Sequence, residues 1–258
     1  MVKINKSASR TIDVLKFIAG TGGDVVFSDI VQTLELPKSS AFELLYTLES
    51  KGVLNYDKER RTYSLGLTAY EIFSGYLNNL SLYQIAKPYM QELVKKHNIT
   101  VNLALESGGS TVYLEKLEGD YPLRTSSKVG SIMPIHTTAL GRAILATYDD
   151  SRIAQIMSNV VFSKKTEYTI DSMEKLMEEI RKTRKFGYSV DDRECSAEMV
   201  CIGVPIFNRH GLAIASISFA LFYSQLKSEQ IPAFGEELKA TAAAISRCLG
   251  YRVGTGGK

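Results

Sequence analysis

The chain has 258 residues, of which 45% are hydrophobic and 23% charged, and its formal net charge is +3 at pH 7. This length allows two domains with separate cores. The apolar runs are too short to span a bilayer, and the polar, basic N-terminus is not followed by an apolar region, so we expect a cytoplasmic protein. The three cysteines, an odd number without metal-ligand spacing, argue against a disulfide framework or a zinc site, and we expect no cofactor.

Residues 1–66 read as three helices followed by a hairpin. The first helix is indicated by an apolar stripe of Ala8, Ile12, Leu15 and Ala19. Ser28 is the expected cap of a short second helix, and Pro37 stands near the start of the third. Two helices joined by a short turn, the second starting with small polar residues, are typical of a helix-turn-helix that enters a major groove. A plain helical bundle is the alternative.

The hairpin would form the wing of a winged helix. Segments Val53–Tyr56 and Thr62–Leu65 alternate in polarity around a basic tip. The candidate DNA-contacting residues of the third helix and the wing are Lys38, Ser39, Ser40, Phe42, Glu43, Lys58, Arg60 and Arg61. Residues 1–66 hold nine Lys and Arg against eight Asp and Glu, a net charge of +1, so we expect modest non-specific affinity for DNA.

Residues 67–82 are interpreted as a connecting helix. Its apolar positions, spaced by three and four, are Tyr70, Phe73, Leu77 and Leu80. This spacing fits a coiled-coil seam between two chains, and packing on its own domain is the alternative. A dimer suits a helix-turn-helix protein that reads two half-sites.

Residues 83–253 are typical of a mixed domain in which an antiparallel sheet is flanked by helices, an α+β fold. Strands are expected over Thr100–Glu106, Thr111–Leu117, Val200–Pro205 and Ala213–Phe219. Helices are expected after Leu82, with Pro88 bending or interrupting the first, and over Arg152–Val160, Ser172–Phe186 and about Ile231–Tyr251. The glycine-rich tail 254–258 is predicted to be disordered.

The segment GSIMPIHTTALGRAILA, Gly130–Ala146, leads into a helix that begins near Thr138. Such a start points backbone N–H groups toward whatever lies in front, which suits a carboxylate. An ordinary helix capped by Thr137 or Thr138 is the simpler interpretation.

This segment resembles the signature of the IclR family of bacterial transcription regulators, from which Ile135 and Arg142 depart conservatively. The third helix is similar to the family's Pro-Lys-Ser-Thr-x-x-Arg-Leu-Leu pattern, although Glu43 replaces its arginine. Glu43 could accept from a cytosine amino group, or binding could depend more on the basic residues. The resemblance implies a winged helix joined to a GAF-like effector-binding domain.

The resemblance also implies where an effector would bind. The residues carried over from the family's effector-contacting segments are Met133, Ala139, Leu140, Asp191, Cys201, Ser216 and Ser218. His136 and Thr138 in the signature join them, and Asp191 would bind hydroxyl groups. Arg124, in YPLRTSSKVG, is a second possible carboxylate ligand; this string and the final CLGY are similar to the branch that senses 2-keto-3-deoxygluconate and related sugar acids.

The sequence therefore predicts a DNA-binding regulator, more in keeping with a repressor, that is controlled by a small carboxylate. Its expected partners are a palindromic DNA operator and a second copy of the chain, with pairing of dimers into tetramers left open. The alternatives are a metabolite-binding module without DNA binding and a regulator of glyoxylate or aromatic-acid catabolism. An enzyme using His136 with Cys195 or Cys201 is disfavoured, because no nucleophile elbow, P-loop or metal motif accompanies them.

Overall fold

The structure is a computed structural model that describes residues 4–72, 81–120 and 127–252. Contacts within the chain divide it into two compact units, Met1–Leu80 and Ser81–Lys258. Ser81 and Leu82, at the end of the expected connecting helix, therefore group with the second unit. Residues 67–72 are helical, and of the expected seam only Tyr70 lies within the described residues, where it is exposed. Arg124 and the tail 254–258 lie outside them.

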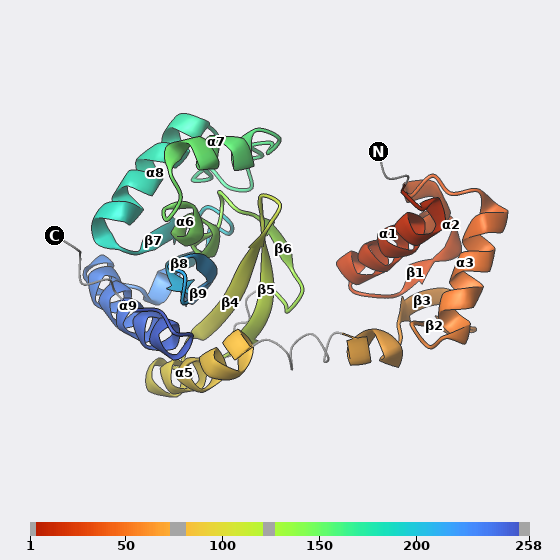
Figure 1. The fold of residues 1–258 in the computed structure, drawn as a ribbon, viewed down its shortest axis with the longest axis horizontal. Coiled ribbons are helices and arrows are strands. Elements are labelled where there is room, and N and C mark those ends of the chain that lie inside the picture. Colours follow the sequence, from red (N-terminus) through yellow and green to blue (C-terminus); the bar gives the residue numbers. More distant parts are fainter. Residues whose placement is uncertain (1–3, 73–80, 121–126, 253–258) are drawn as a thin grey trace. The chain divides into compact units, whose positions relative to one another are not determined.

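The first unit is a winged helix-turn-helix (Figure 1). Its elements are α1 (Lys6–Thr21), β1 (Val25–Val26), α2 (Phe27–Thr33), α3 (Lys38–Ser50), β2 (Leu54–Asp57) and β3 (Thr62–Leu65). The three strands are antiparallel with β3 in the middle, and the β2–β3 hairpin is the expected wing. Apolar side chains from all three helices and β2 form the core, among them Ile18, Ile30, Leu45 and Leu54. This core fixes α3 while its opposite face remains exposed.

Helix α1 buries a different face from the one expected. Val14 and Ile18 are fully buried, whereas Ile12 is 54% exposed and Ala8 and Ala19 are also exposed. Apolar residues occur on more than one side of this helix, so the spacing of its apolar residues is compatible with either of two buried faces. The face with larger side chains is buried because it removes more apolar area from water than alanines can.

Ser28 does not cap α2, and that prediction is wrong. Val26 is the N-cap residue, and no side chain donates or accepts at this cap. The chain passes directly from the extended conformation of β1 into the helix, which leaves Ser28 one residue inside it. Its hydroxyl instead donates to the Asp29 carboxylate at 3.2 Å.

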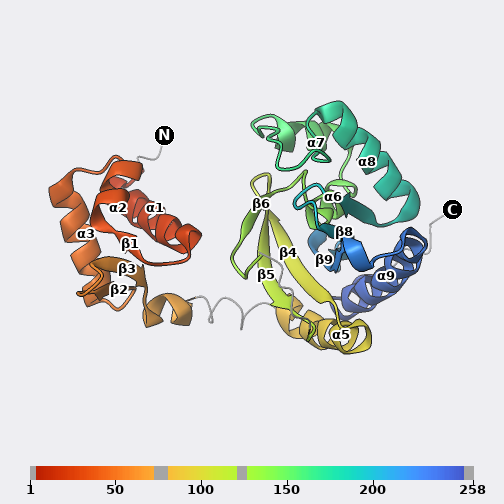
Figure 2. The same ribbon diagram turned by 180° about the vertical axis from the view of Figure 1, so that it is seen from behind.

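The second unit contains a six-stranded antiparallel sheet in the order β6-β5-β4-β9-β8-β7. Its strands are β4 (Thr100–Ser107), β5 (Ser110–Leu117), β6 (Ile132–Pro134), β7 (Ser189–Asp192), β8 (Met199–Phe207) and β9 (Ala213–Phe222). Its helices are α5 (Ser81–His97), α6 (Ala139–Leu145), α7 (Asp150–Met157), α8 (Met173–Phe186) and α9 (Ile231–Cys248). Figures 1 and 2 show α5 and α9 on one face and α6, α7 and α8 on the other. The α+β prediction is confirmed.

Three details differ from the expected elements. Helix α5 continues through Pro88, so of the two expected effects, a bend or an interruption, the interruption does not occur. Helix α7 begins two residues before the expected Arg152, because Asp149 caps it through the Arg152 amide at 2.7 Å. Strands β6 and β7 were not expected; they are short and form the two edges of the sheet, where only one neighbour stabilises them.

Alternation along β9 separates the two faces of the sheet. The Phe219 ring contacts His97 of α5 and Phe234 of α9, with centroid distances of 5.8 and 5.5 Å. Ser216 and Ser218 therefore point to the opposite face, on which α6 lies. This face carries the larger of the two cavities described below.

Candidate functional site

A cavity of about 380 Å³ lies on the α6 face of the sheet. Seven of the residues expected to contact an effector line it: Met133, Thr138, Ala139, Leu140, Asp191, Cys201 and Ser218. They come from β6, the start of α6, β7, β8 and β9, so segments far apart in the sequence meet there. A cavity of this size falls within the range of small-molecule sites, about 300–1,000 Å³.

The start of α6 lies directly on the sheet at Gly203. A side-chain carbon placed at Gly203 would come within 2.5 Å of the Ala139 carbonyl oxygen. The Thr138 hydroxyl accepts from the Gly141 amide at 2.9 Å and lies 3.3 Å from the Thr111 hydroxyl of β5. Thr138 is thus the N-cap expected from the sequence. The close approach and the cap together fix the cavity wall formed by Ala139 and Leu140.

Behind this wall lies a buried ion pair. The Arg142 guanidinium donates to both carboxylate oxygens of Glu194, at 2.6 and 2.8 Å, and the Arg142 side chain is fully buried. It also donates to the carbonyl oxygens of His136 and Val190. Asp191 is next to this pair and accepts from the Glu194 amide at 2.8 Å. Asp191 therefore connects the cavity with Arg142 and Glu194.

Burial dominates the acid–base properties of this region. Desolvation and the Asp191 charge raise the pKa of Glu194 to about 7, although Arg142 opposes that shift. Desolvation also raises the pKa of Asp191 and that of Cys195, the latter to about 12. The Cys195 thiol is therefore protonated at neutral pH and donates to the Thr137 carbonyl. The pKa of the Cys201 thiol is raised well above its ordinary value, so neither thiol is an activated nucleophile.

One cation lines the cavity among its described residues, Lys165. The segment that carries it is bonded to the turn after β7, because the Thr166 and Thr169 hydroxyls donate to the carbonyls of Arg193 and Glu194 at 2.8 and 2.7 Å. The Arg193 guanidinium also lies 4.0 Å from the Tyr168 ring centroid. These contacts hold Lys165 beside Cys195 on the rim of the cavity.

Two of the predicted effector-contacting residues, His136 and Ser216, lie outside the cavity lining. His136 is fully buried and packs on Phe162 at a centroid distance of 4.7 Å, while its ring nitrogens have no hydrogen-bond partner among the described residues. Burial and the nearby Arg142 charge lower the pKa of His136 to about 4. Ser216, two residues before Ser218 on β9, is fully buried and lies outside the cavity lining. Arg124 lies in the part of the chain that the structure does not describe.

Sequence reasoning missed several lining residues, above all Asn102 and Lys165. Asn102 lies opposite Ser218 in the β4–β9 ladder, and its Nδ2 donates to the Ser218 hydroxyl at 3.5 Å. Its Oδ1 is buried without a partner in the part of the chain that the structure covers. A lone asparagine in an apolar strand was the available signal, but its partner became evident only from the strand register.

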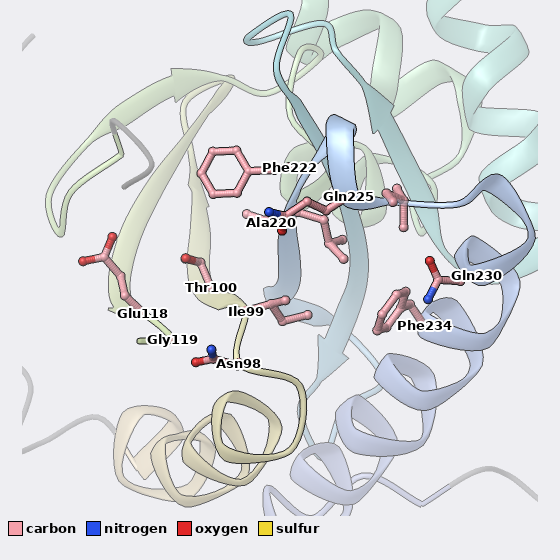
Figure 3. A pocket seen from close by; sticks show the side chains of 12 residues that line it. Asn98, Ile99, Thr100, Glu118, Gly119, Ala220, Phe222, Gln225, Gln230 and Phe234 are labelled. Carbon is pink, nitrogen blue, oxygen red and sulfur yellow. The ribbon is translucent and has the colours of Figure 1, made fainter. Parts of the chain in front are cut away.

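A second cavity, of about 140 Å³, opens near the ends of β4, β5 and β9 (Figure 3). Asn98, Glu118, Gln225 and Gln230 surround it together with the Phe234 ring. It is less than half as large as the first cavity, and none of the described residues predicted to contact an effector lines it. The larger cavity is therefore the candidate effector site.

The first unit presents the candidate DNA-contacting residues on α3 and the wing. Phe42 and Glu43 are exposed on α3 together with Lys38 and Ser39, whereas Ser40 is half-buried. In the wing, Asp57 accepts from the Glu59 and Arg60 amides, and these bonds lower the pKa of Asp57 and shape the tip that carries Lys58 and Arg61. Arg60 lies 3.4 Å from Asp24, an exposed contact of little energetic weight that leaves Arg60 available to phosphate.

Comparison with known sequences decides the family. The profile described as "IclR helix-turn-helix domain" matches residues 7–58, and the profile described as "Bacterial transcriptional regulator IclR C-terminal" matches residues 74–247. The chain belongs to the IclR family. Because both profiles describe transcriptional regulators, this IclR-family protein is a DNA-binding regulator with an effector-binding domain and not an enzyme.

Full-length relatives agree with this assignment. The chain is 30% identical over 247 residues to the HTH-type transcriptional regulator KdgR of Escherichia coli K12, covering 95% of this chain and 94% of KdgR. It is 28% identical over 247 residues to the HTH-type transcriptional repressor AllR of the same strain, covering 96% and 91%. The crystal structure of Thermotoga maritima IclR superposes with a TM-score of 0.75 at 31% identity, covering 95% and 99%.

The described part of this IclR-family protein also bears on membrane spans and metal sites. None of its helices is long and apolar enough to cross a membrane. No group of three or more His, Cys, Asp and Glu side chains in it is arranged to hold a metal ion.

Proposed function

We propose that this IclR-family regulator is a repressor that releases its operator when a hydroxylated carboxylate, a sugar acid such as 2-keto-3-deoxygluconate, binds in the larger cavity. The observation that carries the proposal is the composition of the wall: among the described residues that line the cavity, one cation, Lys165, accompanies Asp191, Asn102 and Ser218. A cation suits a carboxylate, and the other three groups suit hydroxyls.

The hydrogen-bonding groups of the cavity wall support a ligand with several hydroxyl groups. Asn102 Oδ1 is a buried acceptor that nothing among the described residues satisfies, and a ligand hydroxyl would supply the missing donor. Asp191 accepts from the Glu194 amide through Oδ1, and as a carboxyl group that lines the cavity it can also accept from a ligand hydroxyl. The similarity to KdgR supports the sugar-acid branch, and the name of AllR supports repression.

Control of DNA binding requires that the ligand favour one arrangement of two paired winged helices over another. We propose a homodimer, able to pair into a tetramer, on a palindromic operator, because helix-turn-helix units read two half-sites. Light scattering of the full chain with and without operator DNA measures this assembly. A monomer under both conditions would contradict the proposal.

A thermal-shift screen tests the effector. The panel contains 2-keto-3-deoxygluconate, glucuronate, galacturonate, pyruvate, glyoxylate and 4-hydroxybenzoate. A ligand at 100 times its dissociation constant adds about 2.7 kcal/mol to the free energy of unfolding, which raises the melting temperature by several degrees. We expect a shift with the sugar acids, weakened in Asp191→Asn. The same ligand should release operator DNA in an anisotropy assay; a shift confined to the aromatic acid or glyoxylate would disprove the sugar-acid assignment.

A further inference from the structure

The outer face of α3 has an unusual chemical character for a DNA-reading helix. Residues spaced by three and four along it, Ser39, Phe42, Glu43 and Tyr46, all lie on the side away from the core. Phe42 and Tyr46 are 61% and 64% exposed, and their rings stack at a centroid distance of 6.4 Å with 15° between planes. The two stacked rings form an exposed apolar patch, and such a patch is typical of a binding surface.

Glu43 lies on this face without a partner. Its carboxylate makes no hydrogen bond or ion pair with any of the described residues, whereas its backbone carbonyl accepts from the Thr47 hydroxyl. Within α3 the single basic residue is Lys38, at the N-terminal end. Arginine and lysine are the side chains that bind the O6 and N7 acceptors of guanine. The middle of α3 therefore has no arginine or lysine to bind guanine.

We infer that α3 reads thymine methyl groups through Phe42, supported by Tyr46, and the amino group of cytosine through Glu43. In the major groove, thymine offers an apolar C5 methyl and cytosine offers the N4 amino donor. An aromatic ring complements the first and a carboxylate accepts from the second. This inference rests on the operator binding assigned to the regulator and adds the base chemistry of each half-site.

The electrostatics of the unit fit this mode of reading. A carboxylate in the groove is repelled by phosphates on both sides, so it costs affinity wherever no amino donor faces it. Lys38 at the end of α3 and the wing residues Lys58 and Arg61 supply the compensating phosphate contacts. Glu43 thus acts mainly by rejecting sites that lack cytosine at the facing position.

The experiment starts with selection of duplexes by the full-length protein from a random DNA library. Anisotropy at one fixed salt concentration then compares the selected duplex with a copy in which uracil replaces thymine, which deletes only the methyl groups. We expect about fourfold weaker binding for each contacted methyl, the value of one buried methylene. Phe42→Ala should bind the two duplexes equally, whereas Tyr46→Phe should keep the difference.

A second comparison tests Glu43. Exchanging the facing C·G pair for the other three pairs should weaken binding by about tenfold, and Glu43→Gln should reduce that discrimination. Asp13→Asn, an exposed acid on α1, is the matched control and should discriminate as the unaltered chain does. Because Phe42 and Glu43 are exposed, circular dichroism should show all variants folded.

The outcomes separate this inference from operator binding itself. One result is an enriched duplex for which Phe42→Ala and Glu43→Gln keep the base preferences of the unaltered chain. That result would overturn the inference and leave DNA binding intact. Failure to enrich any duplex, at low salt and without added carboxylates, would overturn operator recognition as a whole. Loss of uracil sensitivity in Phe42→Ala, together with relaxed cytosine preference in Glu43→Gln, would establish the inference.

Discussion

Arg142 and Glu194 face each other in the interior of the second unit as a two-point ion pair, with nitrogen–oxygen distances of 2.6 and 2.8 Å. Their side chains are 0% and 7% exposed. Removing one partner leaves the other charge buried without compensation, so Arg142→Met should lower the free energy of unfolding by about 3–5 kcal/mol. Adding Glu194→Leu should restore part of that loss. Urea denaturation measures both; an exposed control, Arg152→Met, should change stability by less than about 0.5 kcal/mol.

Glu194 should also make stability depend on pH. Because its pKa is raised from 4.5 to about 7, the folded state holds a proton that the unfolded state has already lost across this window. Its contribution is therefore complete below pH 4.5 and is lost as pH rises through 7. The difference in unfolding free energy between the unaltered chain and Glu194→Gln should decrease over that range and stay constant above it. An increase with pH would contradict the raised pKa of the buried Glu194 carboxyl.

His136 should show the opposite dependence. Burial lowers its pKa from 6.5 to about 4, so the unfolded state binds a proton before the folded state does. The stability that His136 contributes is present above pH 6.5 and is lost as pH falls toward 4, by up to about 3 kcal/mol. Subtracting the curve of His136→Leu from that of the unaltered chain should reveal this loss. Operator binding at pH 7.5 should hardly change, because His136 does not line the cavity.

Two serines on one strand offer a matched pair for testing the cavity. Ser218 lines it, whereas Ser216, two residues earlier on the same face, does not. Ser218→Ala should weaken binding of the effector found in the thermal-shift screen by about 1 kcal/mol, or roughly fivefold in dissociation constant. Ser216→Ala should leave that constant unchanged. Isothermal titration would reject the assignment of the cavity if the two substitutions had equal effects.

Periodicity in the sequence was sufficient for most of the fold. The alternation before and after Gly108 and Gly109 predicted the β4–β5 hairpin, because two residues of positive φ make the tight turn. The end of α8 at Gly187 and the start of α6 at Thr138 followed from capping rules. The short edge strands β6 and β7 were missed because, unlike the four-residue strands of the wing, neither was recognised as half of a hairpin.

The candidate site was predictable only where side chains belong to a recognisable segment. The signature and the alternation of β9 placed Thr138 and Ser218 correctly on the cavity. Whether a neighbouring residue such as His136 or Ser216 also reaches the cavity depends on how closely α6 packs on the sheet at Gly203. A single sequence does not give the distance between α6 and the sheet. Lys165 was missed because it comes from an irregular segment whose position depends on the Thr166 and Thr169 bonds to the turn after β7.

Those same bonds give the cavity rim a mechanical property. Lys165 and Cys195 both line the cavity, and the Thr166 and Thr169 hydroxyl bonds connect their two segments. Glu194, next to Cys195, forms the ion pair with Arg142 of α6. A molecule that draws Lys165 inward must therefore also pull on the turn after β7, and through Glu194 on the helix behind the wall. The rim thus links a residue that would contact the ligand, Lys165, to the buried Arg142 of α6 through the turn after β7.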